Sequence, residues 1–451
     1  MNDLVVVLPG ILGSTLRDEN GPVWEVSGRA ALRAVLSFGR SLRRMTLPED
    51  IGDEHPGDGI EPVALMADLH VLPGIWTPLK GYDRLTKRLR SIGFTEEKGN
   101  LLLFPYDWRL SNRYNGARLG REVERALGKL RETQPDAKAV FVCHSMGGLV
   151  ARWYIEKCGG HEVTRKLITI GTPYRGAAAA VEQLVNGLRK GLGPLAIDLT
   201  EFARSMPSLH QLMPEYACVE SPHGLLKTTE TTLPELRTKM VEDAMAFHVA
   251  INNAEEARPA SATATHAIIG AKQPTATTIR IADGKATPVR TYDGRDLFGD
   301  STVPSVGSTR PDVMLDSNVL RRVTEQHTSL QDNPAVLDEV ESIITAVAVQ
   351  VRNIEWTHPR VTVPDLLLTG EDLPVDVELD EENRRAVKIA VTDEAGRLVE
   401  SRAPSVASGI VSARFPGLAP GAYSVQVSGL KPGAPVAAVT SAVLVMDCPE
   451  V

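Results

Sequence analysis

The sequence has few cysteines: four stand among 451 residues, at irregular spacing. Neither a C-x-x-C pair nor an H-E-x-x-H pattern occurs, so the sequence predicts no disulfide framework and no zinc site. We therefore expect no metal and no cofactor. The four cysteines are expected to be small buried residues: Cys143, Cys158, Cys218 and Cys448.

Long apolar runs are also missing. No stretch approaches the ~20 apolar residues that a membrane-spanning helix requires. The first apolar run, residues 4–8, has no basic segment before it and is too short for the core of a signal peptide. We expect a cytoplasmic protein from these two absences.

The sequence has no excess of positive charge. A general nucleic-acid binder needs a concentrated basic face, so a net charge of −8 predicts that nucleic acid is not a partner. The hydrophobic share of 43% is that of a globular protein, and 451 residues are enough for two domains with at least one large core.

The most informative stretch that is present covers residues 139–148. An apolar run predicts a buried strand, His144 and Ser145 end it, and two glycines open an apolar helical pattern. A serine at the apex of a strand–turn–helix unit is typical of the G-x-S-x-G nucleophile elbow, here with Cys143 in place of the first glycine. The alternative is a serine that only caps an ordinary helix.

Strands and helices alternate over the first 350 residues, which predicts a parallel sheet wrapped by helices. Two stretches interrupt the alternation, about residues 17–80 and the helical stretch 177–258, and both are expected to form a cap or lid. Within the first, residues 48–78 are expected to be irregular. Residues 28–45 place arginines on one helical face and apolar residues on the other, which fits a surface helix, a cap helix or a helix on an anionic membrane.

After residue 355 the pattern changes to short alternating strands separated by Gly, Pro and Asp turns, which predicts an all-β sandwich. We therefore expect an α/β-hydrolase domain over residues 1–352 and an immunoglobulin-like sandwich over residues 356–451. The sandwich is expected to dock a protein partner, a second copy of the chain or a surface, with an inert spacer as the alternative.

A serine nucleophile needs a base and an orienting carboxylate, and hydrolases of this fold place them in the order Ser, Asp or Glu, His. Downstream of Ser145, Asp300 follows a glycine in a loop, and His327 lies in a loop before the last helix. Asp296 is the second candidate acid and Asp293 a third. His144 is adjacent to Ser145, so its side chain is expected to point away from the nucleophile.

Five short motifs occur in order along the chain: residues 9–14 (PGILGS), 106–109 (YDWR), 144–148 (HSMGG), 299–303 (GDSTV) and the loop around His327. Together they resemble the lecithin:cholesterol acyltransferase family, which includes lysosomal phospholipase/acyltransferases. The resemblance implies an α/β-hydrolase core with Ser145 as nucleophile, Asp300 as acid and His327 as base. It also implies an oxyanion hole made by the backbone N–H groups of Ile11 and Met146. The absence of cysteine from residues 1–142 and the C-terminal sandwich depart from the secreted mammalian members.

The expected function is a serine hydrolase or acyltransferase of lipid esters, of phospholipase or lipase type, with a lipid ester substrate that a membrane surface presents. Hydrolysis and acyl transfer use the same catalytic groups, so the sequence does not indicate which of the two reactions takes place. Two alternatives remain open: a thioesterase, peptidase or other non-lipid serine hydrolase, and an idle hydrolase fold that serves as a binding protein.

Overall fold

The computed structural model describes residues 2–24, 44–67, 81–190, 197–258, 263–311, 313–315, 317, 320–346, 357–379, 385–404, 409–431 and 434–446. Nearly all of the two-faced stretch 28–45 lies outside these ranges, as do both predicted domain boundaries, at residues 352 and 356.

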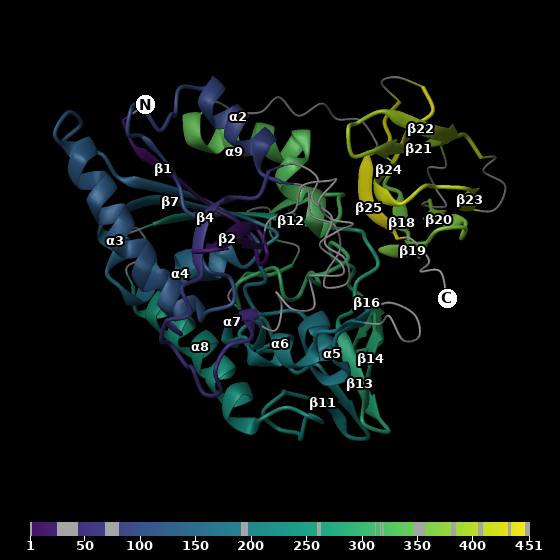
Figure 1. The fold of residues 1–451 in the computed structure, drawn as a ribbon, viewed down its shortest axis with the longest axis horizontal. Helices are drawn as coiled ribbons and strands as arrows, with labels where there is room; N and C mark the ends of the chain where they lie inside the picture. Colours follow the sequence, from purple (N-terminus) through teal and green to yellow (C-terminus); the bar gives the residue numbers. More distant parts are fainter. Residues whose placement is uncertain are drawn as a thin grey trace.

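A six-stranded sheet occupies the centre of the molecule, in the order β17-β12-β7-β6-β1-β5 (Figure 1). Every neighbouring pair in it is parallel, which confirms the sheet predicted from the alternating pattern. Its strands are β1 (Leu4–Leu8), β5 (Leu101–Leu103), β6 (Ala139–His144), β7 (Thr164–Ile170), β12 (Ala264–Gly270) and β17 (Arg321–Val323).

Helices cover both faces of this sheet, and the side chains of β1 show why its sequence is apolar throughout. Val5 and Val7 pack in a cluster with α2 (Asp83–Ser91) and α9 (Pro334–Thr345). The alternate residues of the same strand pack in a second cluster with α3 (Asn112–Arg131) and α4 (Gly147–Lys157). A parallel strand buried on both faces has no polar side, so a continuous apolar run is what it needs. The predicted α/β-hydrolase class is confirmed.

The two predicted insertions hold more strand than the sequence indicated. Antiparallel β2 (Ser14–Asp18), β3 (Gly21–Trp24) and β4 (Glu61–Leu65) form a small sheet, so the expectation of irregular structure over residues 48–78 is wrong at β4. Strand β4 is half exposed and gains its hydrogen bonds from distant β2, which a local pattern does not reveal.

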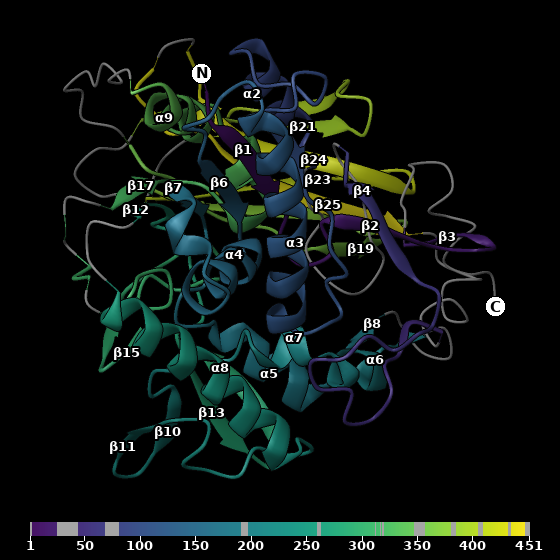
Figure 2. The same cartoon turned by 90° about the vertical axis from the view of Figure 1, so that its left-hand side faces the viewer.

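The second insertion contains helices and short strands, and its elements lie together at one end of the molecule (Figures 1 and 2). A hairpin in it joins a hairpin that follows β12, giving a sheet in the order β11-β10-β13-β14. The helices here are α5 (Ala178–Asn186), α6 (Thr200–Ser205), α7 (Pro207–His210) and α8 (Thr238–Ala257). The strands of the insertion are β8 (Arg189–Lys190), β9 (Ile197–Asp198), β10 (Val219–Ser221) and β11 (Gly224–Leu226). Those that follow β12 are β13 (Thr278–Ala282), β14 (Lys285–Val289), β15 (Thr291–Tyr292) and β16 (Arg295–Asp296). The part that these elements play as a lid stays a prediction.

Two further sheets form from the C-terminal part of the chain and lie beside the main sheet (Figure 1). One has the order β18-β20-β23, the other β19-β25-β24-β21-β22. Alternate residues of their strands meet in one apolar cluster, as in a sandwich. The strands are β18 (Arg360–Thr362), β19 (Leu366–Leu368), β20 (Leu373–Glu378), β21 (Val387–Asp393), β22 (Leu398–Arg402), β23 (Ile410–Phe415), β24 (Gly421–Gly429) and β25 (Val439–Met446).

Among the cysteines, Cys143 and Cys218 are buried as expected, whereas Cys158 is exposed. The expectation is wrong there because Cys158 caps the C-terminal end of α4, where the chain leaves the core. Cys448 lies outside the described residues.

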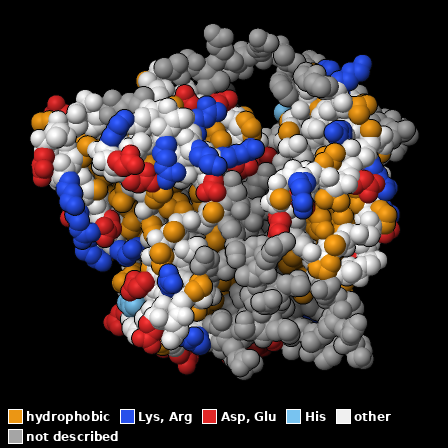
Figure 3. Space-filling view, turned by 45° about the horizontal axis from the view of Figure 1, so that its top comes forward, with side chains coloured by type: hydrophobic (Ala, Val, Ile, Leu, Met, Phe, Trp, Pro, Cys, Tyr) orange, Lys and Arg blue, Asp and Glu red, His pale blue; other side chains and the backbone are white. Residues whose placement is uncertain are grey.

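Charged side chains of both signs are interspersed on the face shown in Figure 3, over the main sheet and the C-terminal sheets alike. Within the described ranges, no helix is both long and apolar enough to cross a membrane.

Candidate functional site

Ser145 stands at the sharp turn between β6 and α4. Its φ of 51° lies in the left-handed region, which costs a non-glycine residue free energy and is typical of functional turns. Two contacts hold it there: its N–H donates to the Ile170 carbonyl at 2.9 Å, and the Thr172 hydroxyl donates to its own carbonyl at 2.9 Å. The residue that caps α4 is Met146, without a side-chain cap bond, so the helix-capping alternative for Ser145 is wrong.

Two glycines let the loop after β1 approach this turn. A Cβ atom on Gly147 would lie 2.4 Å from the Pro9 carbonyl oxygen. A Cβ on Gly10 would lie 2.9 Å from the Cβ of Ser145. Real Cβ atoms essentially never come so close to another heavy atom, so each position requires glycine.

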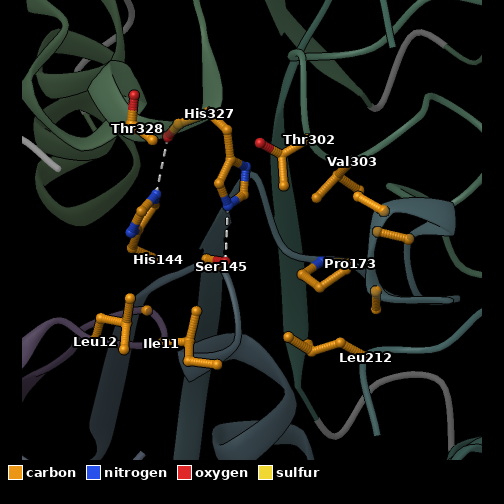
Figure 4. Close-up of a pocket in the computed structure, with 14 residues that line it drawn as sticks. Ile11, Leu12, His144, Ser145, Pro173, Leu212, Thr302, Val303, His327 and Thr328 are labelled. Atoms are coloured by element: carbon orange, nitrogen blue, oxygen red, sulfur yellow. Dashed lines mark hydrogen bonds between the residues drawn. The ribbon is translucent and has the colours of Figure 1, made fainter. Parts of the chain in front are cut away.

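Ser145, His327 and Asp300 come together in one chain of hydrogen bonds, although they are far apart in the sequence. The Ser145 hydroxyl oxygen lies 2.8 Å from Nε2 of His327 (Figure 4). On the other side of the ring, Nδ1 lies 2.7 Å from the Asp300 carboxylate. Exposed fractions are 5% for Ser145, 6% for His327 and 0% for Asp300, so bulk water competes little for these bonds. This arrangement can deprotonate a serine hydroxyl.

The Asp300 carboxylate is held independently of the histidine. Its second oxygen, Oδ1, accepts hydrogen bonds from the backbone N–H groups of Thr302 at 3.1 Å and Val303 at 2.7 Å. Asp296, the second candidate acid, is exposed and accepts from the N–H of Phe298 instead. Asp293 is exposed in the turn between β15 and β16. The structure therefore brings Asp300, and neither alternative, to His327.

The side chain of His144 makes no contact with the Ser145 hydroxyl among the hydrogen bonds that the structure describes, as expected. It instead links two other parts of the site. Its Nδ1 lies 2.9 Å from the Tyr82 hydroxyl, and its Nε2 lies 3.2 Å from the backbone carbonyl of His327. The sequence does not identify Tyr82 as part of the site, because a single tyrosine at the start of a helix carries no motif.

A pocket opens beside Ser145. Its lining is largely apolar, with Ile11 and Leu12 from the loop after β1 and Leu212 from the second insertion (Figure 4). The small side chains Ala177, Ala179 and Ala180 line it as well. An apolar pocket with few polar groups next to a nucleophile suits a hydrocarbon chain.

The two predicted oxyanion-hole residues flank the nucleophile. Ile11 lines the pocket, and Met146 directly follows Ser145 at the start of α4. Their role stays a prediction. Among the described residues, no group of three or more His, Cys, Asp and Glu side chains is placed to hold a metal ion.

Residues 76–254 match the model of the lecithin:cholesterol acyltransferase family. The predicted resemblance is thus confirmed over that range, which contains β6, Ser145 and α4, and it supports ester hydrolase or acyltransferase chemistry. A protein of Saccharomyces cerevisiae, described as uncharacterized protein YJR098C, is 28% identical over 174 residues. The match covers 38% of this chain and 23% of the yeast protein, so the chain spans about a quarter of that relative's length.

Two solved structures show weaker likeness. The propeptide form of the Bacillus licheniformis lipase BlEst2 has a TM-score of 0.40 at 10% identity, covering 98% of this chain and 93% of the lipase. CopC from Methylosinus trichosporium has a TM-score of 0.18 at 17% identity, covering 21% of this chain and 99% of that protein. Both scores are below 0.5, so the fold assignment stands on the strand order.

Proposed function

We propose that the protein hydrolyses or transfers the acyl groups of lipid esters through a covalent intermediate on Ser145. The single observation that supports this most directly is the 2.8 Å separation of the Ser145 hydroxyl oxygen and Nε2 of His327. That geometry is within the range that a general base needs to take a proton from a nucleophile.

In the proposed first step, Nε2 of His327 takes the hydroxyl proton while the Ser145 oxygen attacks the ester carbonyl carbon. The carbonyl π electrons move to the oxygen, and the backbone N–H groups of Ile11 and Met146 stabilise this oxyanion. Each such donor is worth about 10²–10³ in turnover in serine hydrolases. Asp300 orients the imidazole and stabilises its protonated form.

The tetrahedral intermediate collapses when the C–O bond to the leaving alcohol breaks and the imidazolium gives its proton to that alcohol. Water or an acceptor alcohol then attacks the acyl-enzyme, with His327 again taking the proton, and Ser145 is regenerated. Both outcomes use the same groups, so the balance between hydrolysis and transfer depends on which acceptor reaches the pocket.

The apolar lining of the pocket supports a lipid acyl chain as the group that is transferred. We further propose that the protein is cytoplasmic and that a membrane surface presents its lipid ester substrate. Flotation of the protein with liposomes tests this part, because a protein that works on such a surface should rise with the vesicles.

The decisive experiment compares the wild-type protein with Ser145→Ala on phospholipids, acylglycerols, acyl thioesters and peptides. Loss of the nucleophile should lower turnover by about 10⁶-fold, as in serine proteases. A fluorophosphonate probe should label the wild-type protein and the control Ser91→Ala, an exposed serine on α2, but not Ser145→Ala. Failure of the wild-type protein to label would favour the idle binding protein. Turnover of thioesters or peptides alone would favour the other hydrolase classes.

A further inference from the structure

The segment 324–329, called the His327 loop below, enters the short 3-10 helix η3 (His327–Asp332) and is bonded on both sides of His327 to the C-terminal part of the chain. The Thr324 hydroxyl lies 2.6 Å from Nδ1 of His358, and the side-chain amide of Gln326 donates to the Val361 carbonyl at 3.1 Å. Two residues after His327, the Ser329 hydroxyl donates to the Thr440 carbonyl at 3.1 Å. A contact with β25 thus occurs two residues from the proposed catalytic base.

Glu325 makes the central contact of this set. It is 3% exposed, and its Oε1 accepts hydrogen bonds from the N–H of Gln326 at 2.9 Å and from the N–H of Thr440 at 2.8 Å. Its Oε2 accepts from the Asn333 side chain at 3.0 Å, at the N-terminal end of α9. One carboxylate therefore joins the His327 loop, α9 and β25.

The register of β25 explains why its edge is open to this loop. On one side the strand pairs with β24 over residues 439–445, whereas on the other side β19 pairs only with residues 444–446. The backbone N–H and C=O of Thr440 on that second side are bonded to Glu325 and Ser329. Within the described part of the chain, these two side chains thus make the bonds to Thr440 that a neighbouring strand would otherwise make.

A second contact of the same kind holds the Asp300 loop. The side-chain amide of Gln273 donates to the Pro359 carbonyl at 3.1 Å and accepts from the N–H of Val361 at 3.2 Å. The backbone of Gln273 pairs with Gly299, directly before Asp300, through bonds of 3.0 and 3.1 Å. Segments of the C-terminal part of the chain therefore contact residues that flank both His327 and Asp300.

We propose that Glu325 is a positioning residue, and that through it the C-terminal sheets hold the imidazole of His327 at the nucleophile. The inference rests on the proposed function. A displacement of about 1 Å at a catalytic group costs on the order of 10²-fold in rate. Holding the His327 loop in place therefore contributes a factor of that order to turnover. The C-terminal sheets then contribute to catalysis, because they position the proposed catalytic base.

The test uses the full-length protein with Glu325→Met, which removes both acceptor oxygens, and Glu325→Gln, which keeps an oxygen for the two backbone N–H groups. Glu325→Met should lower kcat on the order of 10²-fold and leave KM nearly unchanged, because Glu325 is not among the residues that line the pocket. Glu325→Gln should retain most of the wild-type kcat. Hydrogen exchange of the Thr440 amide should be faster in Glu325→Met.

Tyr423→Phe is the matched control, since it removes a hydrogen bond to the Ala419 carbonyl within the C-terminal part of the chain, and none of the described hydrogen bonds joins the Tyr423 hydroxyl to either loop. It should leave kcat unchanged. If Glu325→Met does not fold, Ser329→Ala replaces it, because it removes only the bond to the Thr440 carbonyl and should lower kcat in the same direction by less.

Unchanged kcat in Glu325→Met, with faster exchange at Thr440, would overturn the positioning role and leave the proposed function standing. Equal losses of kcat in Glu325→Met and Tyr423→Phe would also overturn it, because they would indicate general destabilisation. Absence of Ser145-dependent turnover in the wild-type protein would instead overturn the proposed function.

Discussion

The Tyr82 hydroxyl lies 2.9 Å from Nδ1 of His144, and both side chains are buried. The N–H of Gly10 donates to the same hydroxyl oxygen at 2.7 Å. The His327 carbonyl can only accept, so Nε2 of His144 carries the ring proton and donates it there. Nδ1 of the neutral ring is then the acceptor, and the Tyr82 hydroxyl donates to it. The loop after β1, the serine turn and the His327 loop are thereby joined through one neutral imidazole.

Tyr82→Phe should therefore weaken both stability and catalysis. It leaves the buried N–H of Gly10 without its acceptor, which costs about 1–3 kcal/mol in the free energy of unfolding. Because Gly10 precedes Ile11, kcat should also fall roughly tenfold. Tyr216→Phe is the control: its buried hydroxyl donates to the Thr277 carbonyl, away from the site. Denaturant unfolding and steady-state kinetics measure both effects, and equal kinetic losses in the two variants would contradict the role given to Tyr82.

Asp300→Asn should lower turnover by about 10⁴-fold, because an amide that donates to Nδ1 favours the wrong tautomer of His327. Asp296→Asn, at an exposed position with no contact to the imidazole among the described hydrogen bonds, should have little effect. Kinetics of the two variants on one ester substrate decide the assignment. A large loss in Asp296→Asn with a mild one in Asp300→Asn would reverse it.

Gly10→Ala should damage the site without unfolding the protein. The new methyl group would lie 2.9 Å from the Cβ of Ser145 and 3.1 Å from Nδ1 of His144, so the loop or the serine must move. Turnover should fall on the order of 10²-fold. Gly128→Ala on α3 meets nothing within 4 Å and should stabilise the helix by about 1 kcal/mol with full activity. Full activity in Gly10→Ala would show that the close approach is not needed.

Stability should fall as the pH falls below neutrality. Burial lowers the pKa of His144 to about 3, with the nearby charge of His327 contributing, and burial lowers the pKa values of His210 and His248 to about 4. In the unfolded chain each titrates near 6.5, so between about pH 4 and 6.5 the unfolded state binds more protons than the folded state. The free energy of unfolding is then highest above pH 6.5 and is lost as the pH falls.

Each buried histidine contributes a slope of up to about 1.4 kcal/mol per pH unit in that window. Denaturant unfolding at several pH values measures the slope. His248→Gln should lower the slope by about one such contribution. The control His223→Gln, at an exposed position, should leave the slope unchanged. The same slope in His248→Gln and the wild-type protein would contradict the prediction.

The sequence was sufficient for the core strands and for the serine turn because both depend on local patterns. A continuous apolar run such as residues 4–8 and the small residues after Ser145 are required wherever a parallel strand meets a helix. The order of Ser145, Asp300 and His327 could be predicted as well, because the fold fixes that order.

The remaining features depend on contacts between distant segments. Strand β4 exists because β2 offers it hydrogen bonds, and Tyr82 belongs to the site because α2 packs beside the serine turn. Glu325 is two residues from His327, yet its role depends on the open edge of β25, more than a hundred residues away. No local pattern reports such a pairing.

The contact between Glu325 and Thr440 also bears on when the protein becomes active during its synthesis. Ser145, Asp300 and His327 leave the ribosome well before β25 does, so the main sheet can form before the bonds between Thr440 and the His327 loop exist. The His327 loop gains its bonds to Thr440 only when that strand has emerged. On the proposed function, a nascent chain that lacks this strand should cleave esters more slowly than one that contains it.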